Sequence, residues 1–174
     1  MGENKSTKKN KRAERNRAKK PIEVISGVYF GENRFLRVVT QPKDKPGFVS
    51  SISNTVTNFQ LANRHGNIGL IAHNYLGGRF FQDLLPGDCI FVMDGHGRRR
   101  NYHVKEILRY QAVNPHSTRS DFIDLESKLV CTASDVFKRV YTGKHRLVLQ
   151  TCIKKGKNAE WGRMFVIAQP IYKR

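Results

Sequence analysis

The sequence predicts a mainly β domain with two short helices. Six short apolar runs, each bounded by turn residues, are typical of β-strands: 35–40, 68–73, 89–93, 102–110, 146–153 and 164–171. The fourth run begins with period-two alternation, because Tyr102 and Val104 are apolar while His103 and Lys105 are polar. The tract Asp-Gly-His-Gly at 94–97 predicts a hairpin between two of these runs. Many short strands with few helices favour a closed or nearly closed β-barrel.

Two segments carry helical patterns. The clearer one is 133–141, where Thr132 and Asp135 form a capping-box pattern and Gly143 follows the last apolar residue. The second is 54–63, with apolar residues on one side only. We therefore expect two short helices beside the strands.

The chain divides into a basic tail and one domain. It has 174 residues, 39% of them hydrophobic, which suits a single domain with a real core. It has 32 Lys and Arg against 14 Asp and Glu, a formal charge of +18. Residues 1–20 are a low-complexity segment with nine Lys and Arg against two Glu, and residues 21–174 hold the rest. We expect the tail to be disordered.

The charge predicts attraction to polyanions, either nucleic acid or an anionic surface. The alternative is a solvated tail that only aids solubility. The tail residues expected to contact a polyanion are Lys8, Lys9, Lys11, Arg12, Arg15, Arg17, Lys19 and Lys20.

The three cysteines do not form a metal-binding pattern. Cys89, Cys131 and Cys152 are separated by 42 and 21 residues, so no C-x-x-C spacing is present and we expect no zinc site. Cys89 and Cys131 lie in apolar contexts, which predicts buried core residues, with a disulfide between them as the alternative. Nor does the sequence carry a P-loop or a dinucleotide fingerprint, so no cofactor is expected.

Three residues at the ends of apolar runs carry a possible chemistry. Cys152 ends one run, Arg163 opens the next, and His73 ends a run far upstream. A thiol, an imidazole and a guanidinium are the groups that acyl transfer through a thioester requires. Each also has a structural interpretation: a buried core cysteine, a core histidine and a surface arginine.

His145 is a weaker partner for Cys152. It lies at the other end of the same predicted strand, roughly 23 Å away at the rise of a β-strand.

The segments around these residues resemble sortases, a family of cysteine transpeptidases. The resembling segments are 71–78, 85–90, 110–111, 120–125, 149–153 and 161–168, and they look most like sortase-domain proteins of filamentous green bacteria. The resemblance implies an eight-stranded barrel in which Cys152 is the nucleophile, His73 the general acid and base, and Arg163 the oxyanion stabiliser.

The same resemblance implies a reaction and supporting residues. A short sorting motif would be cleaved after threonine, and the acyl group would pass from the Cys152 thioester to an amine, or to water. Thr151 is expected to support the oxyanion or hold a substrate carbonyl, with inward packing as the alternative. Asn74 is expected to orient His73, or simply to begin a turn.

A second function class stays open: a sortase-fold protein that binds nucleic acid or a ribonucleoprotein through its basic surface. The resemblance implies the cell surface. The sequence shows neither a secretory signal nor an apolar run of about 20 residues, which would suit the cytoplasm if the chain is complete. Intact His73, Cys152 and Arg163 favour the enzyme.

Overall fold

The computed structural model describes residues 24–31, 33–117 and 119–172. The basic tail at 1–20, including its predicted disorder and its eight candidate polyanion-binding residues, lies outside the described residues. In the described part of the chain, no helix is both long and apolar enough to cross a membrane.

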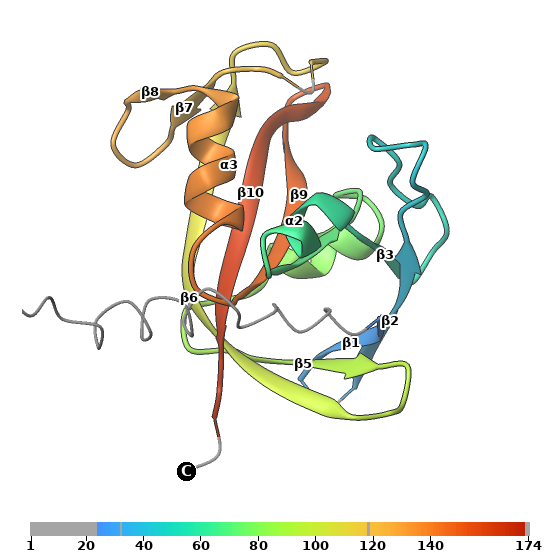
Figure 1. The fold of residues 1–174 in the computed structure, drawn as a ribbon. Coiled ribbons are helices and arrows are strands. Elements are labelled where there is room, and N and C mark those ends of the chain that lie inside the picture. The colour runs from blue at the N-terminus through green and yellow to red at the C-terminus, as the bar shows by residue number, and fades with distance from the viewer. Residues whose placement is uncertain (1–23, 32, 118, 173–174) are drawn as a thin grey trace, which may run out of the picture.

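The described strands form a closed eight-stranded barrel with a two-stranded extension (Figure 1). Around the barrel the strand order is β10-β9-β4-β3-β2-β1-β5-β6, and β6 pairs with β10 to close it. The barrel strands are β1 (Ile25–Phe30), β2 (Arg34–Thr40), β3 (Thr55–Asn58), β4 (Ile68–Ile71), β5 (Cys89–Asp94), β6 (Arg99–Ala112), β9 (Leu147–Lys155) and β10 (Asn158–Pro170). The extension adds β7 (Phe122–Asp124) and β8 (Val130–Cys131) to β6. The predicted mainly β barrel with two short helices is confirmed.

Two of the barrel's pairings are parallel, β2 with β3 and β4 with β9, and the others are antiparallel. Side chains that alternate inward along the strands fill the barrel, among them Val28, Leu36, Ile90, Leu149 and Val166. Each of these five is fully buried. Closure leaves the eight barrel strands without a free edge, which is how small antiparallel proteins avoid edge-to-edge association.

The predicted helix at 133–141 is confirmed as α3 (Ala133–Tyr141). The Thr132 hydroxyl accepts a hydrogen bond from the Asp135 amide at 3.1 Å, and the Asp135 carboxylate accepts one from the Thr132 amide at 3.3 Å. This reciprocal capping satisfies two amide groups at the helix start. The apolar face of α3 packs on a second core cluster that includes Val148 and Phe165.

The helix predicted at 54–63 is wrong in its first half. Thr55–Asn58 is strand β3, and the helix α2 covers only Gln60–Arg64. Thr, Val and Thr at 55–57 are β-branched, which disfavours helix, and all four residues of β3 are buried beside β2. The sequence analysis also missed β1, β7, β8 and the 3₁₀ helix η1 (Gly77–Phe81), all short elements.

The predicted burial of two cysteines is also wrong. Cys89 is exposed and Cys131 is half-buried, and both are free thiols. Cys89 begins β5 directly opposite His103 of β6, so its side chain points away from the barrel interior, whereas its neighbour Ile90 is fully buried. An apolar neighbour along the chain does not bury a strand residue, because successive side chains point to opposite faces.

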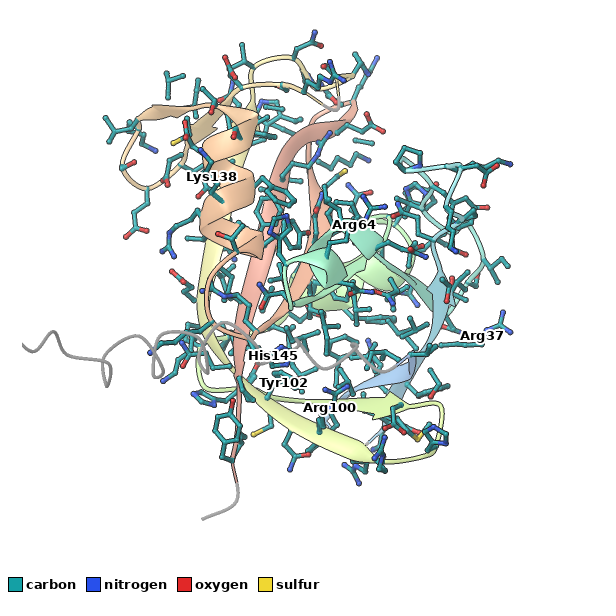
Figure 2. The ribbon with its side chains drawn as sticks, in the orientation of Figure 1. Arg37, Arg64, Arg100, Tyr102, Lys138 and His145 are labelled. Carbon is teal, nitrogen blue, oxygen red and sulfur yellow. The ribbon has the colours of Figure 1, made fainter. Side chains whose placement is uncertain are left out.

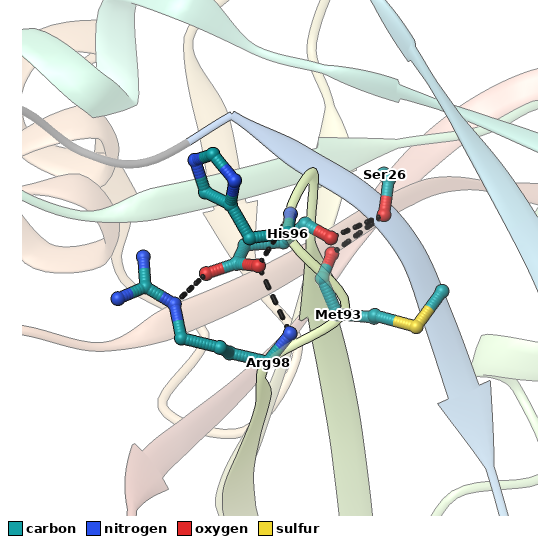
Figure 3. A network of polar contacts seen from close by, with 5 residues as sticks. Ser26, Met93, His96 and Arg98 are labelled. Carbon is teal, nitrogen blue, oxygen red and sulfur yellow. Dashed lines mark hydrogen bonds and ion pairs between the residues drawn. The ribbon is translucent and has the colours of Figure 1, made fainter.

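The hairpin predicted at 94–97 is confirmed between β5 and β6 and is held by Asp94 (Figure 3). The buried Asp94 carboxylate accepts hydrogen bonds from the amides of His96 and Arg98, at 2.8 and 3.0 Å, and from Nε of Arg98 at 2.8 Å. The Ser26 hydroxyl, from β1, donates to the backbone carbonyl of Asp94 at 2.8 Å. Charge-assisted bonds of this kind define the turn and fix the register of the two strands.

Candidate active site

A cavity of about 600 Å³ lies where β4, β9 and β10 meet the loops that follow β2 and β6. Cys152, His73 and Arg163 all line it, and so do Thr151 and Glu160. The structure therefore brings together the three residues that sequence analysis placed at separate strand ends. Asn74 does not line this cavity.

Cys152 and Arg163 meet because β9 and β10 form one hairpin. In the antiparallel register, Arg163 lies directly opposite Cys152. Side chains of directly opposed residues point to the same face of a sheet, with Cβ atoms about 5 Å apart. Both side chains are half-buried at the cavity wall. Gly162 precedes Arg163, and a Cβ at that position would lie 2.4 Å from the Tyr110 carbonyl oxygen of β6. Only glycine allows β10 to approach β6 this closely.

His73 reaches the cavity because β4 runs parallel to β9. Ile71 pairs with Gln150, and the Ala72 amide donates to the Gln150 carbonyl at 3.1 Å. His73 follows two residues after Ile71, as Cys152 follows two after Gln150. The ladder between β4 and β9 therefore brings the backbone of His73 level with that of Cys152, and both residues line the cavity. The His73 ring stacks on Tyr75, with ring centroids 5.3 Å apart and planes at 21°.

Thr151 supports the backbone that carries His73. Its side chain is 1% exposed, and its hydroxyl donates to the Ala72 carbonyl at 2.9 Å. The inward-packing alternative from the sequence therefore describes its placement, although Thr151 also contributes to the cavity wall. Gly78 of η1 packs against the same group, because a Cβ there would lie 2.2 Å from the Thr151 hydroxyl oxygen.

Asn74 ties two loops together. Its side-chain amide donates to the Ala159 carbonyl at 2.8 Å, which joins the segment after β4 to the β9–β10 hairpin. This bond positions the chain next to His73 through the backbone. The expectation that the Asn74 side chain orients the imidazole directly stays a prediction.

Three backbone carbonyls hold the Arg163 guanidinium. Nη1 donates to the carbonyls of Glu160 and Gly162, at 2.9 and 3.0 Å, and Nη2 donates to the Pro115 carbonyl at 3.2 Å. A guanidinium has five N–H donors in a rigid fork, so these contacts fix its plane and leave donors for a ligand. The Pro115 contact also draws the β6–β7 loop against the cavity.

The electrostatics of the site act on the Cys152 thiol. Burial is the largest effect and raises its pKa; the positive charge of Arg163 lowers the pKa, and the negative charge of Glu160 raises it. The net pKa lies above the ordinary value for cysteine, so the thiol is mostly protonated near pH 7. Sequence analysis missed Glu160, since a carboxylate three residues before Arg163 carries no signal until the hairpin places it in the cavity.

His145 does not line this cavity and is hydrogen-bonded elsewhere, next to Tyr102 (Figure 2). One of its ring nitrogens, Nδ1, lies 2.7 Å from the Gly66 carbonyl, to which it can only donate, and Nε2 lies 3.0 Å from the Tyr102 hydroxyl. In the neutral imidazole, Tyr102 therefore donates to Nε2. His145 is thus a structural residue, and the predicted separation from Cys152 agrees with its absence from the cavity lining.

In the described residues, no three His, Cys, Asp or Glu side chains gather as metal ligands would.

Solved structures that the chain matches include bacterial sortases. Sortase A from Corynebacterium diphtheriae superposes with a TM-score of 0.58 at 13% identity, over 87% of this chain and 62% of that one. Sortase C-1 from Actinomyces oris superposes with a TM-score of 0.56 at 12% identity, over 84% of this chain and 73% of that one. Streptococcus agalactiae sortase C1 gives a TM-score of 0.53 at 15% identity, over 87% and 69%.

The chain has the sortase fold. No family model matches the sequence. No curated protein matches it either. The predicted sortase barrel is therefore confirmed at the level of fold, and the resemblance to proteins of filamentous green bacteria stays a prediction. At 12–16% identity the likeness to sortases is one of architecture, so the roles of individual residues rest on the cavity itself.

Proposed function

We propose that this sortase-fold protein is a cysteine transpeptidase with Cys152 as its nucleophile. The observation that carries the proposal is the shared cavity: a thiol from β9, a guanidinium from β10 and an imidazole from the segment after β4 line one site. Acyl transfer through a thioester requires these three groups within reach of one carbonyl.

In the first half of the reaction, the Cys152 thiol gives its proton to His73, and the thiolate so formed attacks the carbonyl carbon of the scissile peptide bond. Negative charge develops on the carbonyl oxygen, and the unused donors of the Arg163 fork stabilise it. Collapse of the tetrahedral intermediate forms the thioester and breaks the C–N bond. His73 donates a proton to the departing amine.

In the second half, an acceptor amine attacks the thioester carbon. His73 accepts the proton that the incoming amine loses, the C–S bond breaks, and the thiolate of Cys152 is restored. Water in place of the amine completes a hydrolysis, so the same site would act as a thiol protease.

The cavity wall suits a peptide with apolar side chains. Phe48 and Val49 come from the β2–β3 loop, Phe59 precedes α2, and Phe122 and Phe165 come from β7 and β10. Apolar walls with a few convergent polar groups are typical of ligand sites. A sorting motif cleaved after threonine is the substrate class that the family resemblance implies, and we propose it for this chain.

The test is to trap the acyl-enzyme. The full-length protein is incubated with a library of threonine-containing sorting peptides, and intact-mass spectrometry follows the mass gained by the protein. Hydroxylamine, added as a strong amine nucleophile, should release a peptide hydroxamate. We expect Cys152→Ala to gain no mass and to form no hydroxamate. Cys89→Ala is the matched control and should behave as the parent, because Cys89 lies outside the cavity.

Hydroxamate formation by Cys152→Ala at the parent rate would show that the nucleophile is another residue. Loss of activity in His73→Ala and in Arg163→Ala, with unchanged thermal unfolding, would assign the other two roles.

A further inference from the structure

A row of aromatic side chains crosses the outer face of the barrel, and none of them lines the cysteine cavity. Phe35 of β2 lies directly opposite Tyr29 of β1, and Tyr29 lies directly opposite Phe91 of β5. The Tyr29 and Phe35 rings are 4.7 Å apart between centroids. Phe35 is 43% exposed, which is unusual for so large an apolar ring. We call these three residues the aromatic row.

The backbone makes room for the row. Gly27 of β1 lies beneath the Phe35 ring, and a Cβ at Gly27 would lie 2.2 Å from Cε2 of that ring. Phe35 therefore lies flat against the sheet, over a residue without a side chain. The strands β2, β1, β5 and β6 pair antiparallel throughout, so they form one continuous four-stranded face.

Arginines flank the aromatic row on the same face. In the next row of the sheet, Arg37 lies opposite Gly27, Gly27 opposite Met93, and Met93 opposite Arg99. Arg37 and Arg99 are exposed, and Figure 2 shows Arg37 pointing away from the barrel. The aromatic row thus runs beside a second row of residues, which has Arg37 at one end and Arg99 at the other.

Two cavities border this face, and Gly31 and Phe91 line both. The larger one lies at the rim of the barrel, because Arg34 and its partner Phe30 alternate to the other side of the sheet from Phe35 and Tyr29. The larger, of about 600 Å³, includes Arg34, whose guanidinium carbon lies 3.8 Å from the Phe80 ring centroid. The smaller, of about 370 Å³, includes Tyr29 and Arg99, and the Arg99 guanidinium carbon lies 4.4 Å from the Phe91 ring centroid. In each cavity a planar guanidinium group thus lies over an aromatic ring, and a flat ligand group could pack against these planar surfaces.

Two carboxylates also line the larger cavity. They are Asp83 and Asp88, and the Asp88 carboxylate accepts a hydrogen bond from the Leu85 amide at 2.8 Å. Both lie in the segment between η1 and β5, whereas the three arginines come from β2 and β6. The arginines would therefore attract an anionic chain to the β2 and β6 sides of the face. The apolar or aromatic groups of that chain would lie between these two sides, on the aromatic row.

We propose that this face binds single-stranded nucleic acid. Unpaired bases would stack on the aromatic row and in the two cavities, and Arg34, Arg37 and Arg99 would contact phosphates. An antiparallel four-stranded sheet with exposed aromatic rings and cations is suited to this task, since every base has a π-face and every linkage a negative charge. A duplex is a poor fit, because its bases are already stacked on one another. The surface shares no residue with the Cys152 cavity, so it adds a second activity.

The first test separates this surface from general attraction by a basic protein. Fluorescence anisotropy measures binding of fluorescein-labelled U12 and dT12 to the full-length chain across a salt series. The variant Arg34→Gln/Arg99→Gln is compared with Lys154→Gln/Lys157→Gln, which removes the same charge from exposed positions around the β9–β10 turn. We expect only the arginine variant to bind weakly, with a salt dependence shallower by about one counterion for each arginine lost.

The second test detects stacking. Phe35→Leu keeps an apolar cover over Gly27 but removes the π-face; its control is Phe137→Leu, at a half-buried ring on α3. We expect affinity for U12 or dT12 to fall at least about fivefold in Phe35→Leu and not in the control, as loss of one base–aromatic stack requires. An oligonucleotide containing 2-aminopurine should lose fluorescence on binding the parent and keep more of it on binding Phe35→Leu.

Exposed Cys89 reports the location of the ligand, since it lines the larger cavity. Bound U12 or dT12 should slow alkylation of Cys89, as followed by peptide mass spectrometry. Tighter binding of dT12 or of U12 would identify DNA or RNA as the preferred polymer, and either result supports the proposal. Equal binding by both arginine and lysine variants, an unaffected Phe35→Leu, or a 12-base-pair duplex bound as tightly as the single strand would overturn it.

Discussion

Replacing Gly78 by alanine should damage both the stability and the candidate site. Gly78 lies in η1, and its amide donates to the His73 carbonyl at 3.0 Å. A Cβ there would lie 2.2 Å from the Thr151 hydroxyl oxygen, 2.7 Å from the His73 carbonyl oxygen and 2.8 Å from the Ala72 carbonyl oxygen. Two of these three atoms belong to the backbone, so a change of side-chain rotamer cannot relieve the contacts.

The cost can be estimated from these contacts. Each must open to at least 3.0 Å, because real Cβ atoms essentially never approach closer. Overpacking of a well-packed interior costs about 1–3 kcal/mol. Displacing the Thr151 hydroxyl also breaks its bond to the Ala72 carbonyl, which contributes about 1 kcal/mol. We therefore expect Gly78→Ala to lower the free energy of unfolding by about 2–4 kcal/mol. Opening the contact with the His73 carbonyl from 2.7 to 3.0 Å shifts the backbone of His73 by about 0.3 Å, so acyl transfer should fall, by less than the roughly 100-fold loss expected for a 1 Å misplacement.

Urea denaturation measures the first effect, and hydroxamate formation from a sorting peptide measures the second. At a slope of about 2 kcal/mol per molar urea, the unfolding midpoint should fall by about 1–2 M. Gly47→Ala is the matched control, because Gly47 lines the same cavity but a Cβ there meets nothing within 4 Å. If the two variants unfold at the same urea concentration, η1 does not support His73 as rigidly as the contacts imply.

Two further predictions concern the thiol and the helix cap. Alkylation of Cys152 by iodoacetamide should rise with pH through a pKa above that of free cysteine, because burial raises it. Glu160→Gln removes a charge that raises this pKa, so it should speed alkylation at neutral pH, whereas Arg163→Gln removes a charge that lowers it and should slow the reaction. Parent-like rates in both variants would contradict this electrostatic account. Thr132→Ala should lower the free energy of unfolding by about 1 kcal/mol through loss of the cap of α3, as measured by urea denaturation, and an unchanged midpoint would show that the cap is dispensable.

The exposed Cys89 changes one expectation from the sequence. The burial of Cys89 and Cys131 that the sequence predicts would protect both from thiol reagents and leave Cys152 as the reactive thiol. Because Cys89 is exposed and Cys152 is half-buried with a raised pKa, Cys89 should react faster. Experiments on the reactivity of Cys152 therefore need a Cys89→Ala background.

The sequence predicted the strands that have long apolar runs and the helix that has a complete N-terminal capping box. The runs that correspond to β4, β5, β6, β9 and β10 contain enough consecutive apolar or alternating residues to predict a strand. The capping pair Thr132 and Asp135 predicted α3 because capping depends only on residues three apart. The short strand β3 escaped notice, since four residues next to a helix carry too little pattern for either assignment.

The sequence by itself supplied the three chemical groups, a histidine, a cysteine and an arginine. Its placement of Cys152 and Arg163 at strand ends is wrong, because both lie inside their strands, β9 and β10, and only His73 follows a strand end, that of β4. Only the tertiary structure decided that they share a cavity, because parallel pairing of β4 with β9 joins segments 79 residues apart. The same applies to Glu160 beside the thiol and to the aromatic row, whose three rings come from three strands. Local periodicity depends on residues two to four positions apart. Strand pairing depends on closing the whole barrel, and that closure decides which side chains meet.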